Sequence, residues 1–272
     1  MQTFSISPLI FFQSLHRNSN LIQSLVVREV LGRYRGSALG ILWSFFNPVF
    51  MLLVYTFFFS VVFKARWGGS SESKAEFALI LFVGLIIFNL FSECVTRAPT
   101  IILTNTNYVK KVIFPLEVLP IVNLGTACFH MGISFLVWLI FYSAIIGIPP
   151  VTILLFPVIL LPLLLLILGF SWFLASLGVY LRDVSQVTGL AITALMFLSP
   201  IFYSLSSLPI KYQHLLFFNP LTYEIEAMRG ALIAGVAPNW VLFGTYLLVT
   251  GLVAFLGFAW FQKTRKGFAD VI

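Results

Sequence analysis

The sequence predicts an all-α integral membrane protein with six transmembrane helices, an N-terminal amphipathic interface helix and short re-entrant outer helices before the last span. Hydrophobic residues make up 60% of its 272 residues and charged residues only 9%, whereas soluble domains carry about 25% charged residues. The apolar residues also form blocks of about twenty or more, the length that crosses roughly 30 Å of hydrocarbon. This composition excludes a soluble domain, and the length suits one membrane domain.

The six spans are expected at about 39–63, 77–96, 121–146, 152–178, 187–204 and 240–261. Basic residues gather in the N-terminal segment, the second and fourth connections and the tail: Arg17, Arg28, Arg33, Arg35, Arg97, Lys110, Lys111, Arg182, Lys263, Arg265 and Lys266. Fewer lie on the other side: Lys64, Arg66, Lys74, Lys211 and Arg229. The positive-inside rule therefore predicts that both termini are cytoplasmic. The net charge of +7 fits an anionic membrane surface and does not indicate nucleic acid.

The N-terminal segment, 1–38, is expected to form the amphipathic helix at 20–36. Asn18 to Asn20 offer a helix cap, and apolar residues then recur at a spacing of four: Ile22, Val26, Val30 and Tyr34. Glu29 and Arg33 are four apart, as in an intrahelical ion pair. Such a helix lies in the cytoplasmic interface, either as a basic anchor or as a docking surface for a cytoplasmic partner.

The second connection, 97–120, is much longer than the few residues that a bare connector needs. Prolines at 99, 115 and 120 interrupt helices, and the polar stretch from Thr104 to Asn107 precedes Lys110 and Lys111. We expect a short cytoplasmic helix between turns, and the extra length suggests that it forms a contact surface. The alternative is that the segment is an ordinary loop.

The region 205–239, on the outer side, is too apolar for a solvated loop. Asn219 and Pro220 are typical of a helix start, and Gly235 is typical of a helix end. The pattern predicts two short helices that dip into the outer leaflet, where backbone must be buried in protein or line a cavity. An outer gate or vestibule fits, with these candidates: Pro209, Asn219, Pro220, Tyr223 and Arg229.

The sequence contains no recognisable catalytic or nucleotide-binding motif. It has no GxxxxGK[ST] phosphate loop, HExxH, CxxC or GxSxG, and its histidines, at 16, 130 and 214, are scattered. We therefore expect no catalytic, cofactor or metal site in this chain. Charge within the spans is scarce: Glu93 and Arg97, four apart, are expected to neutralise each other, so an ion-gradient carrier lacks its usual groups.

Aromatic residues are abundant in the spans and offer a weakly adhesive surface for a sliding sugar polymer. The candidates to line a channel are Trp43, Phe46, Phe50, Phe57, Phe88, Phe91, Phe202 and Tyr203. The alternative is that these rings face lipid or pack within the protein.

Several runs resemble the membrane subunits of polysaccharide-exporting ABC transporters, the type-2 export permeases, in the branch that exports O-antigen and teichoic acid. They are REVLGRYRGS at 28–37 with LGILWSFFNP at 39–48, KKVIFPLEVLP at 110–120, LRDV at 181–184, SPIFY at 199–203 and NPL at 219–221. The resemblance covers nearly the whole chain, in order.

The resemblance implies a homodimer of six-span domains, here 39–263 with a cytoplasmic tail at 264–272, in a bacterial inner membrane. It implies two cytoplasmic ABC ATPase subunits that hold ATP and Mg, so this chain would have no ATPase activity of its own. The coupling candidates are Arg28, Arg33, Arg35, Asn105, Asn107, Lys110 and Lys111. The implied substrate is lipid-linked polysaccharide, most simply O-antigen, with teichoic acid or capsule as alternatives.

Three other readings stay open at this point. A type-2 permease for a small hydrophobic drug or lipid would share the fold. An integral-membrane enzyme of envelope assembly would need acidic or histidine residues gathered in a sizeable loop, and the outer connection at 147–150 is short. A structural scaffold is the third.

Overall fold

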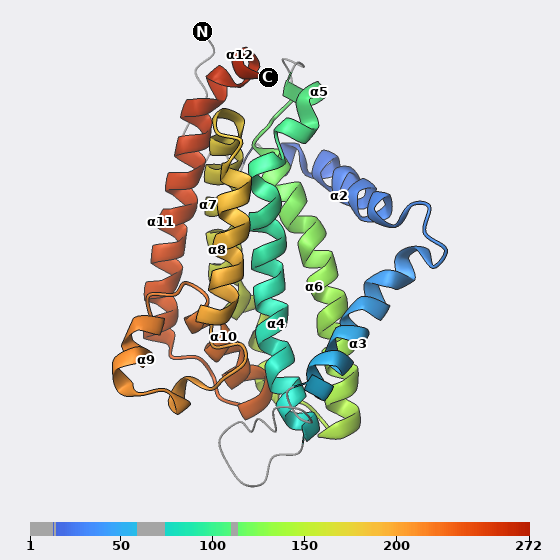
Figure 1. Ribbon diagram of the computed structural model, residues 1–272, viewed down its shortest axis with the longest axis vertical. Helices are drawn as coiled ribbons and strands as arrows, with labels where there is room; N and C mark the ends of the chain where they lie inside the picture. The colour runs from blue at the N-terminus through green and yellow to red at the C-terminus, as the bar shows by residue number, and fades with distance from the viewer. Residues whose placement is uncertain (1–12, 14, 59–73, 110–113) are drawn as a thin grey trace.

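The computed structural model describes residues 13, 15–58, 74–109 and 114–272, and in these residues the regular elements are helical (Figure 1). The predicted all-α class is thus confirmed. Lys110 and Lys111, two of the coupling candidates, lie outside the described residues.

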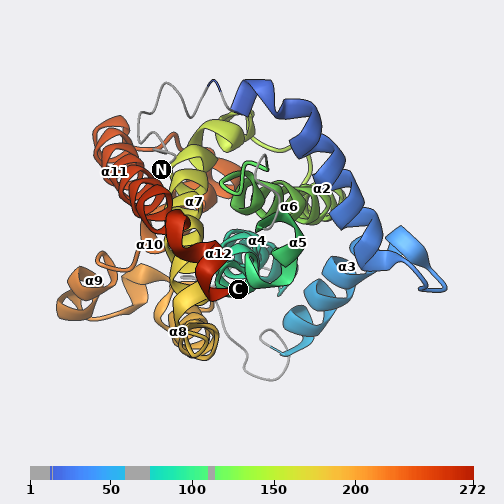
Figure 2. The same ribbon diagram turned by 90° about the horizontal axis from the view of Figure 1, so that it is seen from above.

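The centre of the molecule is α4 (Lys74–Arg97), which lies between α6 (Val118–Ile145), α7 (Phe156–Tyr180) and α8 (Val184–Leu198) (Figures 1 and 2). Between Phe77 and Val95 the helix is buried except at Asn89, Ser92 and Glu93. A helix that is apolar on all sides is stable only when neighbours cover it. The core therefore forms around α4, and the polar residues of this helix mark the side where the covering is incomplete.

The outer pair of long helices, α7 and α11 (Trp240–Thr264), packs with its backbones in close contact. A Cβ placed on Gly257 would lie 2.1 Å from the carbonyl oxygen of Gly169. Small residues at such crossings let two helices approach closely, and the resulting van der Waals packing is one of the forces that associate helices inside a membrane.

The N-terminal helix α2 (Ser19–Tyr34) packs on the first turns of α6. Leu25 lies against Val118 and Val122, and Val26 lies over Gly125, where a Cβ would come within 2.8 Å of its methyl group. The predicted helix is present, but the side chain of Asn18 makes no capping hydrogen bond. The helix is instead fixed by its packing on α6.

A short 3₁₀ turn, η1 (Gly40–Leu42), leads from α2 into α3 (Trp43–Tyr55). Gly36 and Gly40 have φ values of 85° and 53°, a region that favours glycine. The chain can therefore reverse between the two helices, and α3 stands away from α4 at its start (Figure 2).

The second connection contains the turns η3 (Ala98–Thr100) and η4 (Leu103–Asn105) and the short helix α5 (Thr106–Val109). The chain ends with η8 (Arg265–Gly267) and α12 (Phe268–Val271). Both α5 and α12 lie at the same end of the molecule (Figure 1), as the predicted topology requires. The segment 264–272 is more than a tail, because Phe268 is fully buried against Phe261 and Tyr180.

The region before the last span folds at the opposite end (Figure 1). After η5 (Val151–Leu155) and the long α7 come α8 and η6 (Leu205–Ser207), then α9 (Ile210–Leu216), α10 (Thr222–Arg229) and a π-helical turn, η7 (Gly230–Ala234). The helix stop is at Gly235, as expected, with a left-handed φ of 69°. The predicted helix start at Asn219 and Pro220 is two residues early, since α10 begins at Thr222.

Five helices of the described residues are long and apolar enough to span a membrane: Gly40–Phe58, Ala75–Thr100, Val118–Ile145, Val151–Tyr180 and Trp240–Val271. The span predicted at 187–204 corresponds to α8, which has 15 residues. At about 1.5 Å per residue this helix is about 22 Å long, short of the roughly 30 Å of a hydrocarbon core. The total of six spans stays a prediction.

Candidate functional site

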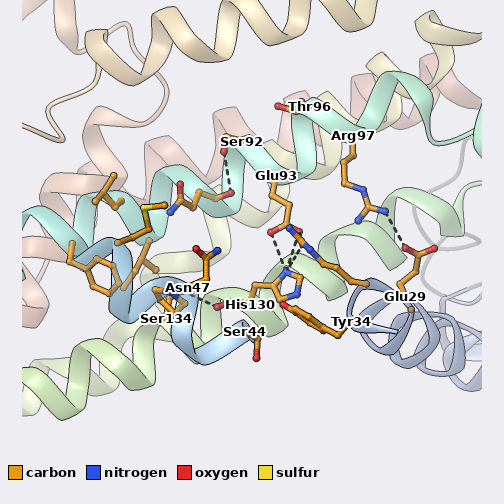
Figure 3. Close-up of a pocket in the computed structure, with 18 of the residues that line it drawn as sticks. Glu29, Tyr34, Ser44, Asn47, Ser92, Glu93, Thr96, Arg97, His130 and Ser134 are labelled. Carbon is orange, nitrogen blue, oxygen red and sulfur yellow. Dashed lines mark hydrogen bonds and ion pairs between the residues drawn. The ribbon is translucent and has the colours of Figure 1, made fainter. Parts of the chain in front are cut away.

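A cavity of about 980 Å³ opens between α2, α3, α4 and α6 (Figure 3). Most of its side chains are polar or charged. Those from α2 are Arg28, Glu29, Arg33 and Tyr34, those from α3 are Ser44, Asn47 and Tyr55, those from α4 are Asn89, Ser92, Glu93, Thr96 and Arg97, and those from α6 are His130 and Ser134. In a membrane protein, such residues face the interior or a water-filled cavity and mark substrate pathways.

The polarity of the cavity changes along α4. Phe82, Leu85 and Ile86 line one end, Asn89 lies in the middle, and Glu93 and Arg97 lie at the other end. From Phe82 to Arg97 the helix rises by about 22 Å. The cavity is therefore a long groove that is apolar at one end, uncharged and polar in the middle, and charged at the other.

The charged end is held together by ion pairs between helices. Arg33 of α2 pairs with Glu93 of α4, and His130 Nδ1 lies 3.1 Å from Oε1 of the same carboxylate. Arg97 of α4 pairs with Glu29 of α2 at 3.1 Å. Figure 3 shows Glu93 beside His130 and Arg97 beside Glu29. The predicted intrahelical pairs, Glu29 with Arg33 and Glu93 with Arg97, are therefore wrong: the helices exchange partners because α2 packs on α6, where its charged side chains reach those of α4.

The coupling candidates divide into two groups. Arg28 and Arg33 line the cavity, and Arg28 also donates to the Tyr108 hydroxyl at 2.8 Å, which ties α2 to α5. Arg35 and Asn107 are exposed, while Asn105 donates to the carbonyl of Ile101 at 2.9 Å. Contact of any of these residues with an ATPase stays a prediction. The contacts of Arg33 with Glu93 and His130 indicate an additional role, which is to join α2 to α4 and α6.

The aromatic candidates lie on a different face of α3 from the cavity. Trp43, Phe46, Phe50 and Phe57 are 46% to 62% exposed, and the cavity is lined instead by the stripe Ser44, Asn47, Pro48, Met51 and Tyr55. The predicted aromatic stripe exists as an exposed surface, and its part in a channel stays a prediction.

Two of the aromatic candidates, both on α4, are almost fully buried. Phe88 and Phe91 are only 4% and 3% exposed, because α4 is covered on that side by the core of the same subunit. Both rings pack mainly within the protein, although Phe91 also lines a second cavity, of about 820 Å³, between α4, α7 and α8, and their part in a channel stays a prediction. Phe202 is half-buried, with its ring centroid 6.4 Å from that of Tyr55, and Tyr203 is half-buried close by.

In the outer region, Arg229 is almost completely buried. Its guanidinium donates to the carbonyls of Ile80, Pro200 and Ile201 at 2.5 to 3.2 Å and to Glu226 at 3.0 Å. Burial lowers the pKa of Arg229 to about 10, so it stays charged at neutral pH. It joins α10, the start of α4 and the segment after α8, which is a structural role.

The other gate candidates also hold α10 in place. Asn219 donates to the carbonyl of Leu198 at 3.1 Å and accepts from the backbone of Leu221, and the Pro220 carbonyl accepts a hydrogen bond from Tyr246. The ring of Tyr223 is tilted by 47° against that of Tyr246, with 4.8 Å between ring centroids, and Pro209 is exposed before α9. The structure thus places four of them in a packed unit, and gating by this unit stays a prediction.

Asn47, Asn89, Ser134 and the pair Glu93 and His130 were not among the candidate site residues. A usable signal was present, because each is a polar residue within an apolar span, where polar groups are costly and mark function. In the described residues there is no group of three or more side chains that could hold a metal ion.

Comparison with known proteins gives one family and several relatives. The family model described as ABC-2 type transporter matches residues 20–233. The O-antigen export system permease protein RfbA of Myxococcus xanthus is 28% identical over 262 residues, 96% of this chain and 98% of the relative. The protein of the same name from Klebsiella pneumoniae is 25% identical over 93% of this chain and 95% of its own. The polysialic acid transport protein KpsM of Escherichia coli is 24% identical over 90% and 93%.

Proposed function

Since this chain belongs to the ABC-2 type transporter family of membrane proteins, we propose that it is the permease that carries O-antigen, as a lipid-linked polysaccharide, out of the cytoplasm. The observation that carries this proposal is the similarity to O-antigen export permeases along nearly the full length of both chains. Apolar spans and the absence of a phosphate loop fit a membrane subunit whose energy comes from ATP on separate cytoplasmic subunits.

The assembly proposed is a homodimer in a bacterial inner membrane, with both termini in the cytoplasm and one ABC ATPase subunit, with its ATP and Mg, on each permease. Two exposed surfaces support it. The α5 end, where Asn107 is exposed, would present a cytoplasmic surface to the ATPase. The exposed stripe with Phe46 and Phe50 on α3 and Phe57 just after it is an apolar surface that a second copy or lipid would cover.

The polar cavity supports a hydroxyl-rich substrate. Asn47, Asn89 and Ser134 offer donors and acceptors that match sugar hydroxyls, whereas a pocket for a hydrophobic drug would be lined mainly by apolar side chains. The similarity to KpsM makes capsular polysaccharide the second candidate, and teichoic acid is a third.

The test is complementation. Deleting the gene for this chain should abolish long-chain O-antigen at the cell surface and leave intracellular polymer, and restoring the gene together with its ATPase should restore export. Loss of a capsule with intact O-antigen would replace the first candidate with the second, and normal surface polysaccharide of both kinds would refute the proposal.

A second comparison separates the polar groove from the aromatic stripe. Asn47→Leu with Asn89→Leu should reduce export more than tenfold at normal protein abundance, since sugar hydroxyls lose partners there. Phe46→Ala with Phe50→Ala is the matched pair on the neighbouring face of α3. If only the aromatic pair reduces export, the polymer follows the aromatic stripe.

A further inference from the structure

The charged end of the cavity contains more arginines than carboxylates. Arg28, Arg33 and Arg97 line it together with Glu29 and Glu93. Two arginines have carboxylate partners, Arg33 with Glu93 and Arg97 with Glu29. In the part of the chain that the structure describes, Arg28 has no carboxylate partner: it donates to the Tyr108 hydroxyl and lies 6.0 Å above that ring. The charged end therefore has a surplus of positive charge and can accept an anion.

Contacts within the protein hold Arg28 and Arg33 in place but do not use all of their N–H donors. The side chain of Arg33 is 50% exposed although its partner Glu93 is only 19% exposed, so the guanidinium reaches from the protein into the cavity. Its Nη1 atom makes the bond to Glu93 and lies 3.1 Å from His130 Nδ1. The remaining N–H donors of Arg33 and Arg28 have the planar fork arrangement that fits phosphate oxygens in bidentate fashion.

The rest of the groove indicates what the anion is attached to. Beyond the arginines the lining is uncharged and polar at Asn47 and Asn89, then apolar at Leu85 and Phe82. A free anion needs only the charged end, whereas an amphiphile with an anionic head group matches the whole gradient. A phosphate ester supplies such a head group, because its charge persists at neutral pH and its oxygens accept several hydrogen bonds at once.

We propose that Arg28 and Arg33 bind the phosphate group of an amphiphilic phosphate ester at the charged end of this cavity. The inference rests on the proposed function, since the natural ligand would be the phosphate that joins the exported polysaccharide to its lipid. A phospholipid head group has the same chemistry and is the other source. Glu93 and His130 hold Arg33 in the orientation for binding, and Tyr108 holds Arg28 in the same way. Because Tyr108 belongs to α5, binding of the phosphate in the cavity is linked to α5.

The experiment measures binding to the purified full chain, in complex with its ATPase, in nanodiscs of neutral lipid. The probe is a polyprenyl pyrophosphate, titrated while intrinsic tryptophan fluorescence or heat is recorded. Saturable binding is expected in the wild type, with an affinity at least about tenfold lower in Arg28→Gln and in Arg33→Gln, because each removes a charge-assisted hydrogen bond. Arg33→Lys keeps the charge but not the fork and should be intermediate.

Arg17→Gln is the matched control, since Arg17 is exposed and lies before α2, away from the cavity. Its affinity should equal that of the wild type. Thermal melting of each variant checks that it is folded, and Arg28→Gln keeps the ion pair between Arg33 and Glu93, so the two variants do not share one structural defect. Equal loss in all three glutamine variants would mean general electrostatic attraction and would overturn the proposal, as would unchanged binding in Arg28→Gln and Arg33→Gln.

Two further ligands identify the chemistry and its source. Polyprenol of the same length should bind far more weakly, and if it binds as tightly as the pyrophosphate the proposal is wrong. Phosphatidylglycerol that displaces the probe at equal concentration would identify a phospholipid head group as the ligand, and failure to displace would identify the polyprenyl carrier. These measurements need no export, so they can fail while complementation succeeds, and the two ideas are tested separately.

Discussion

Arg33 of α2 and Glu93 of α4 form an ion pair between residues that lie 60 positions apart in the chain. Together with the pair between Arg97 and Glu29, it fastens the N-terminal helix across the mouth of the polar cavity. The same contacts that shape the cavity therefore fix the helix whose Arg28 bonds to Tyr108 of α5.

The pairing predicts the result of a double-mutant cycle. Arg33→Gln and Glu93→Gln should couple by about 1 kcal/mol or more in unfolding free energy, since Glu93 is largely shielded from water while Arg33 is half exposed. The matched control is the cycle with Arg33→Gln and Glu29→Gln, two residues that are four apart but do not pair. The measurement is chemical denaturation of the solubilised protein. Strong coupling in the control cycle with none between Arg33 and Glu93 would contradict the exchange of partners.

The close crossing of α7 and α11 predicts that Gly257→Ala is strongly destabilising. The added methyl group would overlap the carbonyl of Gly169, and relieving that overlap should cost about 2 kcal/mol or more. Gly251→Ala is the control on the same helix, where a Cβ meets open space. It should be neutral or stabilise the helix by up to about 1 kcal/mol. Both are measured as melting temperature in detergent, and equal behaviour of the two variants would argue against the close packing.

Arg229 distinguishes a structural role from a gating role. Arg229→Met leaves the carbonyls of Ile80, Pro200 and Ile201 without their donor, and we expect a loss of about 3 kcal/mol with a marked drop in protein abundance. Lys211→Met, which removes an exposed cation from α9, should change abundance little. If Arg229→Met accumulates normally and leaks small solutes across the membrane, Arg229 acts as a gate.

The carboxyl group of Glu224 is buried and, in the described part of the structure, has no hydrogen-bond partner. Burial raises its pKa well above the ordinary value of 4.5, so the folded state keeps a proton that the unfolded state loses. Its contribution to stability is therefore intact below about pH 4 and is lost as pH rises from 4.5 through the raised pKa.

Glu224→Gln cannot ionise and should remove this loss. The variant should melt at a higher temperature than the wild type at pH 8 and at a similar temperature at pH 4, with the difference growing as pH rises. Glu226→Gln, on the half-exposed side of the same helix, is the control and should not reproduce this gain. A wild type and a Glu224→Gln variant with parallel pH profiles would show that the carboxylate has a partner when ionised.

The sequence alone determined the class of the protein and the position of most of its helices. Apolar blocks long enough to cross a bilayer specify where helical spans occur, because apolar side chains favour the lipid and a helix satisfies its own polar backbone groups there. Local signals also sufficed where the physics is local: Gly235 ends a helix because its left-handed conformation suits glycine. The motifs from Arg28 to Ser37 and from Lys110 to Pro120 pointed to the family that the comparisons confirm.

Only the tertiary structure decided which face of each helix meets which neighbour. Periodicity placed Trp43, Phe46 and Phe50 on one face of α3, but it could not say that the cavity lies on the adjacent face with Asn47. It also gave Glu93 and Arg97 as neighbours, and only the position of α2 on α6 shows that each has a different partner on α2. The rotation of a helix about its axis is set by contacts between residues far apart in sequence, such as Arg33 with Glu93 and Gly169 with Gly257, and a local pattern contains no information about them.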